Sequence, residues 1–178
     1  PAPLATTPPI VEQTPDPTRS SPRQVEPAPV LATLIRSLDA RWEDPNAMWD
    51  GRLGLRQGAH TLAHGLVEIE LAEGARVVLE APVSFDLTGT NAMSLDSGRL
   101  VAHVPPSGYG FTVDTPTARI VDYGTEFGVE VADGDRATQG HVFQGEVRAA
   151  ARRGGQIVDQ PVPLYEREGA VIDAGAVS

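Results

Sequence analysis

The segment 111–131, FTVDTPTARIVDYGTEFGVEV, places carboxylate and hydroxyl side chains on both sides of a glycine. Asp122 and Glu126 flank Gly124, and two neighbouring carboxylates can serve as the acid and base of a glycosidase. The segment contains no Cys, Lys or His that could complete another catalytic set, and no polar or aromatic cluster for a sugar surrounds it. We therefore interpret this segment as a structural bend.

Three residues of this bend are each expected to have a different structural role. Gly124 is expected to supply a backbone conformation that a side chain would penalise. The Thr125 hydroxyl is expected to satisfy backbone groups at the bend, and Phe127 to anchor it in the core.

Other ligand and nucleophile patterns point away from catalysis. The imidazoles available to a metal are His60, His64, His103 and His141. On a strand, His60 and His64 would stand roughly 13 Å apart, too far to bind one ion. Asp133 and Asp135 form a close carboxylate pair that could serve Ca²⁺, but a solvated Asp-Gly turn explains it more simply. The serines lack the Gly-x-Ser-x-Gly elbow, and no phosphate loop is present. The sequence predicts neither an enzyme nor a bound metal or cofactor.

The composition limits the classes of binding partner that can be expected. The 178 residues are enough for one hydrophobic core. The 24 acidic residues outnumber the 14 basic ones, all of them Arg, and give a net charge of −10 that disfavours nucleic-acid binding. The dense basic cluster, Arg148 with Arg152 and Arg153, is interpreted as a solvated hairpin tip. Cysteine is absent, and no apolar run is long enough to cross a membrane.

Residues 1–29 contain nine of the 16 prolines and have no apolar periodicity. This composition is typical of a disordered or polyproline-type linker. We expect a Pro-rich linker over 1–29, tethering a β-domain over 30–178 to a membrane segment that lies upstream of this chain.

The elements of the domain are read from its periodicity. Residues 31–42 suit either a helix or a strand, and Asp44-Pro45-Asn46 should end that element. From Leu66 onward apolar and polar residues alternate, and a turn at Glu73-Gly74 indicates a hairpin. Further glycine turns are expected at Ser97-Gly98, Asp133-Gly134, Gln144-Gly145, Gly154-Gly155 and Glu168-Gly169. This spacing predicts an all-β fold: an antiparallel β-sandwich, a jelly roll or a β-roll of short strands.

The segment 111–131 fits this scheme as two strands kinked together. Thr115-Pro116 should interrupt the first strand, because proline cannot donate a ladder hydrogen bond. After Gly124, the residues Phe127, Val129 and Val131 should share the buried face.

Five motifs in order, within GLVEIELAEGARVVLEAP, SGRLVAHVP, FTVDTPTARIVDYGTEFGVEV and HVFQGEVRAA, resemble the FecR domain family. The resemblance runs from about Leu31 to the C-terminus and is closest to versions in large envelope proteins of planctomycete-type bacteria. It implies that 31–42 is an early strand. The signature residues it implies, mainly structural and candidates for partner contact, are Thr115, Pro116, Asp122, Tyr123, Gly124, Thr125, Glu126, Phe127 and Gly145. Tyr123 replaces a common aliphatic residue, which would either widen a neighbouring pocket or expose a hydroxyl.

The resemblance also implies a function. FecR-like proteins are usually single-pass inner-membrane regulators whose periplasmic β-domain relays a signal from an outer-membrane transporter to a cytoplasmic anti-sigma segment. This implies a periplasmic or cell-surface signalling module that contacts a protein of the cell envelope, such as an outer-membrane receptor. We expect the anti-sigma segment, the membrane helix and the receptor-contacting domain to lie outside this chain. The alternative is a carbohydrate-binding or structural module of the bacterial cell envelope.

Overall fold

A computed structural model of the chain describes residues 27–43, 54–131 and 137–178. Most of the expected linker, the turn at Asp44-Pro45-Asn46 and the Asp133/Asp135 loop lie outside these residues, so those expectations stay predictions. The carbonyls of Ala28 and Pro29, at the expected linker boundary, accept hydrogen bonds from Arg56 and Gln57.

The described residues form strands and one short 3₁₀ turn, η1 (Pro106–Gly108), and contain no α-helix. The strands are β1 (Val30–Trp42), β2 (Gly54–Arg56), β3 (Gly58–Leu71), β4 (Arg76–Gly89), β5 (Ala92–His103), β6 (Thr112–Asp114), β7 (Ala118–Asp122), β8 (Glu126–Val131), β9 (Ala137–Gln144), β10 (Glu146–Arg153), β11 (Gln156–Ile157), β12 (Val162–Tyr165) and β13 (Gly169–Asp173). The all-β prediction is confirmed.

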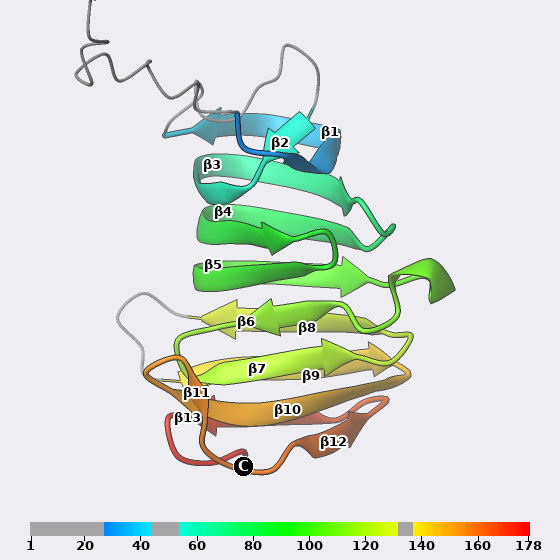
Figure 1. Ribbon diagram of the computed structural model, residues 1–178, viewed down its shortest axis with the longest axis vertical. Helices are drawn as coiled ribbons and strands as arrows, with labels where there is room; N and C mark the ends of the chain where they lie inside the picture. Colours follow the sequence, from blue (N-terminus) through cyan, green and yellow to red (C-terminus); the bar gives the residue numbers. More distant parts are fainter. Residues whose placement is uncertain (1–26, 44–53, 132–136) are drawn as a thin grey trace, which may run out of the picture.

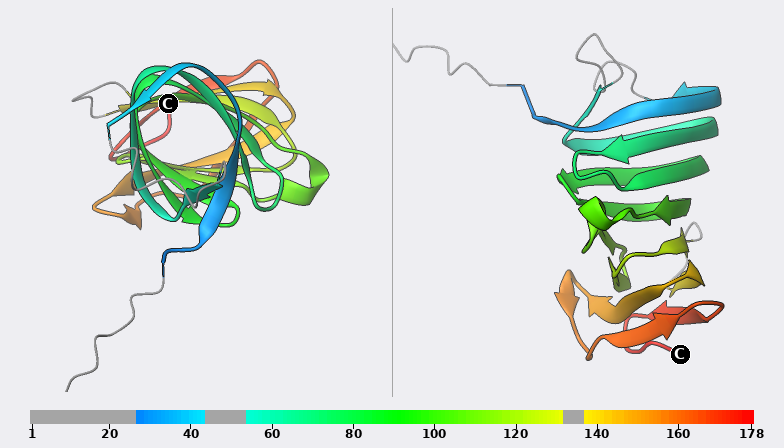
Figure 2. Two further views of the ribbon diagram at one scale, coloured as in Figure 1. Left: turned by 90° about the horizontal axis from the view of Figure 1, so that it is seen from above. Right: turned by 90° about the vertical axis from the view of Figure 1, so that its right-hand side faces the viewer.

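All of these strands belong to one sheet that curls into a roll with two facing layers (Figures 1 and 2). Seen from above in Figure 2, the strands surround a central interior. Layer 1 contains the hydrogen-bonded series 66–71, 76–80, 98–103, β8, β9 and β13. Layer 2 contains 58–62, 83–89, 92–95, β6, β7 and β10, with β11 and β12 beyond β10. The β5–β6 pair is parallel, whereas the other described pairs are antiparallel.

The long strands β3, β4 and β5 bend from one layer into the other without ending. Their registers shift together, between Leu62 and Leu66 and between Glu80 and Ser84. Gly98 sits at this corner of β5 with φ +95°, and a Cβ there would lie 2.5 Å from the Pro82 carbonyl oxygen. The turn predicted at Ser97-Gly98 is therefore wrong, because the glycine allows a bend inside a continuous strand.

The other glycine turns are of two kinds: in some the two flanking strands pair with each other as a hairpin, and in others they do not. Strands β3 and β4 form the hairpin expected at Glu73-Gly74, and β10 and β11 form one across Gly154-Gly155. The motif around Gln144-Gly145 is not a hairpin, because β9 pairs with β8 and β13 while β10 pairs with β7 and β12. Gly145 is instead a corner between the two layers.

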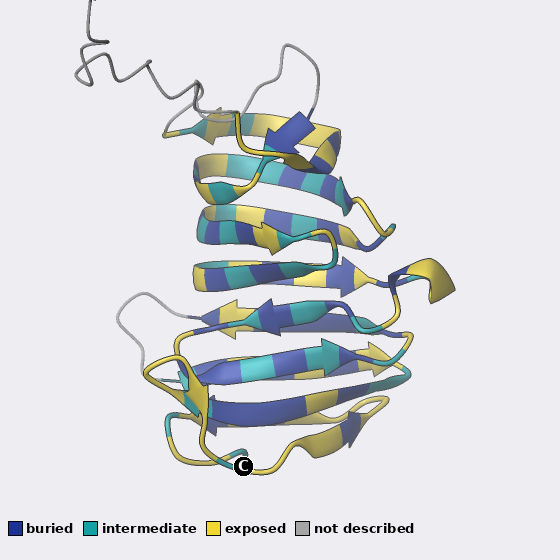
Figure 3. Ribbon diagram, in the orientation of Figure 1, coloured by how far each residue is buried: buried dark blue, intermediate teal, exposed yellow. Residues whose placement is uncertain are grey.

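The core fills the space between the layers, where one face of each strand is buried (Figure 3). Its largest side chains include Phe85, Phe111 and Phe127, each at most 1% exposed. Residues 31–42 are strand β1, as the family resemblance implied, so the helix alternative is wrong. Because the register shifts along β1, Leu38 does not face the core, and its side chain is 66% exposed.

Candidate functional site

The family signature lies at a corner of the roll, where 123–125 connect β7 of layer 2 to β8 of layer 1. Gly124 has φ +90°, a conformation that residues with a Cβ rarely adopt. A Cβ on Gly124 would meet no atom within 4 Å. Its backbone angle, rather than crowding, therefore favours glycine here.

Asp122 holds this corner from the inside. Its side chain is fully buried, and its carboxylate accepts a 2.8 Å hydrogen bond from the Gly124 N–H and a second from the Thr125 hydroxyl. The expectation that Thr125 itself satisfies backbone groups is thus wrong, since its hydroxyl donates to the carboxylate. Phe127, which begins the buried face of β8, is 1% exposed.

Burial raises the pKa of Asp122 to about 6, because the ionised carboxylate loses its hydration. Hydrogen bonds from the backbone of the corner and the charge of His103 act in the opposite direction. Glu126, the other carboxylate of the imagined acid/base pair, is partly exposed on β8 and lies opposite His103 on β5. The two carboxylates are on opposite faces of the sheet, so the structure does not bring them together as a catalytic pair.

Gly145 forms a second corner that packs against the first. It has φ +89°, and a Cβ there would lie 2.7 Å from both the Gly124 carbonyl oxygen and Thr125 Cγ2. The Tyr123 N–H donates a 3.0 Å hydrogen bond to the Glu146 carbonyl across the same junction. Both the backbone angle and the contact with the neighbouring corner therefore favour glycine at this position.

A buried hydroxyl cluster supports the turn between β6 and β7. The Thr115 and Thr138 hydroxyl oxygens are 2.6 Å apart, and those of Thr117 and Thr138 are 2.8 Å apart. Thr117 also donates to the Ile172 carbonyl on β13, so the cluster joins the two layers. Pro116 itself is exposed at the turn. Sequence reasoning found Thr115 but missed Thr117 and Thr138, although Thr138 is a polar residue at a buried position of the β9 alternation.

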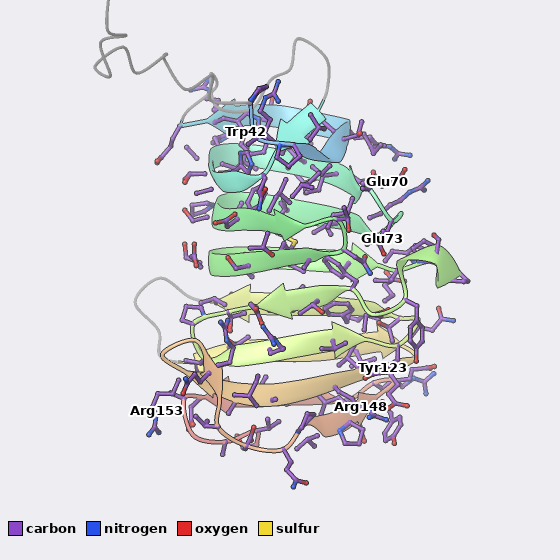
Figure 4. All side chains as sticks on the ribbon, viewed as in Figure 1. Trp42, Glu70, Glu73, Tyr123, Arg148 and Arg153 are labelled. Atoms are coloured by element: carbon purple, nitrogen blue, oxygen red, sulfur yellow. The ribbon has the colours of Figure 1, made fainter. Side chains whose placement is uncertain are left out.

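The outer side of the corner carries aromatic and arginine side chains. The Tyr123 ring makes an edge-to-face contact with Tyr109, with ring centres 5.4 Å apart at 89°. The Arg148 guanidinium lies over the Tyr123 ring, 4.8 Å from its centroid, and Figure 4 shows these two labelled side chains at the same edge of the roll. Tyr123 also lines a cavity of about 160 Å³.

Of the three arginines of β10, Arg153 fits the interpretation of a solvated hairpin tip, because it is exposed and pairs with Gln156 beside Gly154-Gly155. For Arg148 and Arg152 that interpretation is wrong. Arg148 lies inside the β7–β10 ladder, opposite Val121. The Arg152 side chain is only 17% exposed, and it donates to the Thr115 carbonyl at 3.0 Å. Strand pairing brings these arginines over the sheet surface, where they serve packing and hydrogen bonding.

The histidines do not form a cluster, and His60 and His64 contact different groups. His60 is buried and bonds the Arg56 carbonyl at 2.8 Å, whereas His64 is exposed and lies 3.2 Å from the Asp39 carbonyl. Within residues 27–43, 54–131 and 137–178, no group of three or more His, Cys, Asp and Glu residues could hold a metal ion.

Comparison with known proteins identifies the family to which this architecture belongs. The model of the family described as FecR protein matches residues 59–148, about half of the chain. The chain belongs to the FecR protein family. The matched region spans the bent strands, the signature corner and the second corner at Gly145, so both corners lie in the part that identifies the family.

Two solved structures share the fold of this FecR domain. Both are of a protein proposed to be an anti-sigma factor from Parabacteroides distasonis, at 1.65 and 2.50 Å resolution, with TM-scores of 0.55 and 0.54. Each is 18% identical in sequence and is matched over 67% of this chain and 57% of its own. The chain therefore spans little more than half of the length of those structures.

A search of curated protein sequences found no match. Among the described residues, no helix is long and apolar enough to cross a membrane.

Proposed function

We propose that this FecR domain is an extracytoplasmic signalling module that acts by contact with another protein. Family membership supports the signalling role, and the anti-sigma description of its structural neighbours agrees with it. The main support for contact with another protein comes from the outer side of the signature corner. Tyr123, Tyr109 and Arg148 lie together there at the surface. Tyrosine and arginine are enriched among the residues that dominate protein–protein binding energy.

The buried side of the same corner supports a role in presentation rather than catalysis. Asp122 is turned inward and bonded to the corner, and Gly124 and Gly145 allow two chain reversals to pack together. A surface fixed in this way loses little conformational entropy on binding. The proposal places the domain in the periplasm or at the cell surface, tethered by residues 1–29 to a membrane anchor and requiring no cofactor.

Site-specific photocrosslinking tests the contact in the full-length protein within its own cell envelope. A photoreactive amino acid would replace Val121 of layer 2 in one variant and Val101 of layer 1 in another, since both side chains are accessible. We expect light-dependent crosslinks to an envelope protein, identified by mass spectrometry, from at least one position. If neither position crosslinks to a protein under signalling and non-signalling conditions, the proposed mode of action is wrong.

A further inference from the structure

We propose that layer 2 binds an extended acidic segment of a partner protein, with the carboxylate of that segment on Arg148. The binding surface consists of Tyr109, Val121, Tyr123, Arg148, Ile157 and Pro161, and we call it the tyrosine–arginine surface. The inference rests on the proposed function and adds to it the face that binds and the chemistry of the bound segment.

The shape of the surface favours an extended segment over a folded domain. Its cavity of about 160 Å³ is lined by Val121 and Ala150 together with Arg119, Tyr123, Arg148, Ile157 and Pro161. A cavity of this size accepts one or two side chains, whereas pockets for whole small molecules are typically about 300 Å³ or more. The aliphatic lining suits an apolar side chain of the segment, and Arg148 stands beside it for an acidic one.

The charge of layer 2 favours an acidic partner, although the whole chain is acidic. Strands β6, β7 and β10 carry Arg119, Arg148 and Arg152 on the outer face of this layer, against the outward carboxylates of Asp114 and Glu146. The layer 1 strands beyond β5, which are β8, β9 and β13, have the opposite balance: they carry Glu126, Glu130 and Asp173 outward and no arginine. A negatively charged segment is therefore attracted to layer 2 and repelled by layer 1.

Arg148 is the arginine of layer 2 best placed to receive a carboxylate. Arg119 already makes two 2.7 Å hydrogen bonds to Asp114, and Arg152 is held by the Thr115 carbonyl. Arg148 has only a 3.4 Å contact with Glu146, and its side chain is 51% exposed. Its guanidinium lies 4.8 Å from the centroid of the Tyr123 ring, and this cation–π contact restrains the side chain, so an incoming carboxylate needs to order less of it.

The experiment is an NMR titration of the ¹⁵N-labelled chain with a synthetic nonapeptide of alternating Glu and Leu. A matched peptide carries Gln in place of every Glu. We expect chemical-shift changes confined to Tyr109, residues 118–123, β10 and residues 157–161, and about tenfold weaker binding of the Gln peptide, as the loss of one charge-assisted hydrogen bond implies.

Three variants localise the interaction. Arg148→Gln and Ile157→Glu are each expected to weaken binding of the Glu peptide about tenfold, the first by removing the cation and the second by adding a repelling charge. The control Arg99→Gln removes an equally exposed arginine from layer 1 and should change the affinity less than twofold. Thermal melts of all three variants verify that they remain folded.

Several outcomes would overturn the inference: no shifts at millimolar peptide, equal binding of the Gln peptide, or shifts confined to layer 1. Shifts on layer 2 with maltohexaose but not with the peptide would favour a glycan instead. Concentration-dependent self-association abolished by Arg148→Gln, without peptide binding, would favour a second copy of the chain. Photocrosslinks from Val101 but not from Val121 would refute this surface alone, whereas crosslinks from neither would refute the proposed function as well.

Discussion

Replacing Gly145 by alanine should destabilise the domain far more than replacing Gly124, although both glycines have nearly the same backbone angle. Their φ values are +89° and +90°. The strain of placing an L side chain in this region is about 1–2 kcal/mol, and it applies to both positions. A Cβ on Gly124 meets nothing within 4 Å, so Gly124→Ala should lower the free energy of unfolding by about that amount alone.

The Gly145 variant carries a second cost. Its methyl group would lie 2.7 Å from the Gly124 carbonyl oxygen and Thr125 Cγ2, closer than atoms can approach, so one corner must move. Such overpacking typically costs about 1–3 kcal/mol. The movement also strains the Tyr123–Glu146 backbone bond. We therefore expect a total loss of about 3–5 kcal/mol for Gly145→Ala.

Urea unfolding monitored by far-UV circular dichroism measures both losses, provided that the slope with denaturant is unchanged. Gly154→Ala is the matched control, because Gly154 has φ +57° in a surface turn with no atom within 4 Å of a Cβ. Its loss should be about 1 kcal/mol. If Gly145→Ala proved no more destabilising than Gly124→Ala, the packing of the two corners would not explain why glycine stands at position 145.

Three further predictions concern buried polar groups. Because the pKa of Asp122 is about 6 in the folded protein against an ordinary 3.8, its contribution to stability is fully present below about pH 4 and is lost as the pH rises through 6. From pH 8 to pH 4, the wild type should therefore gain up to about 3 kcal/mol relative to Asp122→Asn, and parallel urea midpoints for the two proteins would contradict this. Thr138→Val leaves the hydroxyls of its two threonine neighbours with fewer partners and should cost about 1–3 kcal/mol in the same assay, and a loss below 0.5 kcal/mol would refute the cluster's role. Arg152→Gln should cost about 1–2 kcal/mol, whereas Arg148→Gln should stay within about 0.5 kcal/mol, and equal losses would show that the two arginines are not distinct.

Local pattern predicted the parts of this fold that depend on neighbours in sequence. The alternation around Glu73-Gly74 predicted a hairpin because the two strands that flank this turn pair with each other. Gly98 and Gly145 have similar surroundings in sequence, yet one bends a single strand and the other changes layers. Which strands pair depends on long-range contacts, and a glycine in a sequence does not reveal them.

In the candidate site, too, local features could be predicted from the sequence and long-range contacts could not. A glycine requirement at Gly124 is a local backbone property, and the sequence predicted it. Tyr109 meets Tyr123 only because the Gly110 N–H bonds the Asp122 carbonyl, which joins the loop after β5 to the end of β7. That contact depends on the order of strands in the sheet, and no spacing in the sequence encodes it.

The arginines of β10 show why composition alone gave the wrong picture of the surface. Arg148 and Arg152 are four residues apart on one strand and share its outer face, so they look equivalent in sequence. Arg152 lies beside the β6–β7 turn, where the Thr115 carbonyl and the Asp114 carboxylate draw it inward. Arg148 lies beside the signature corner, where its guanidinium rests over the Tyr123 ring and its side chain stays exposed. The same type of side chain thus bonds within the fold at one end of the strand and stays exposed at the other, and the glycine corner that positions Tyr123 determines the difference.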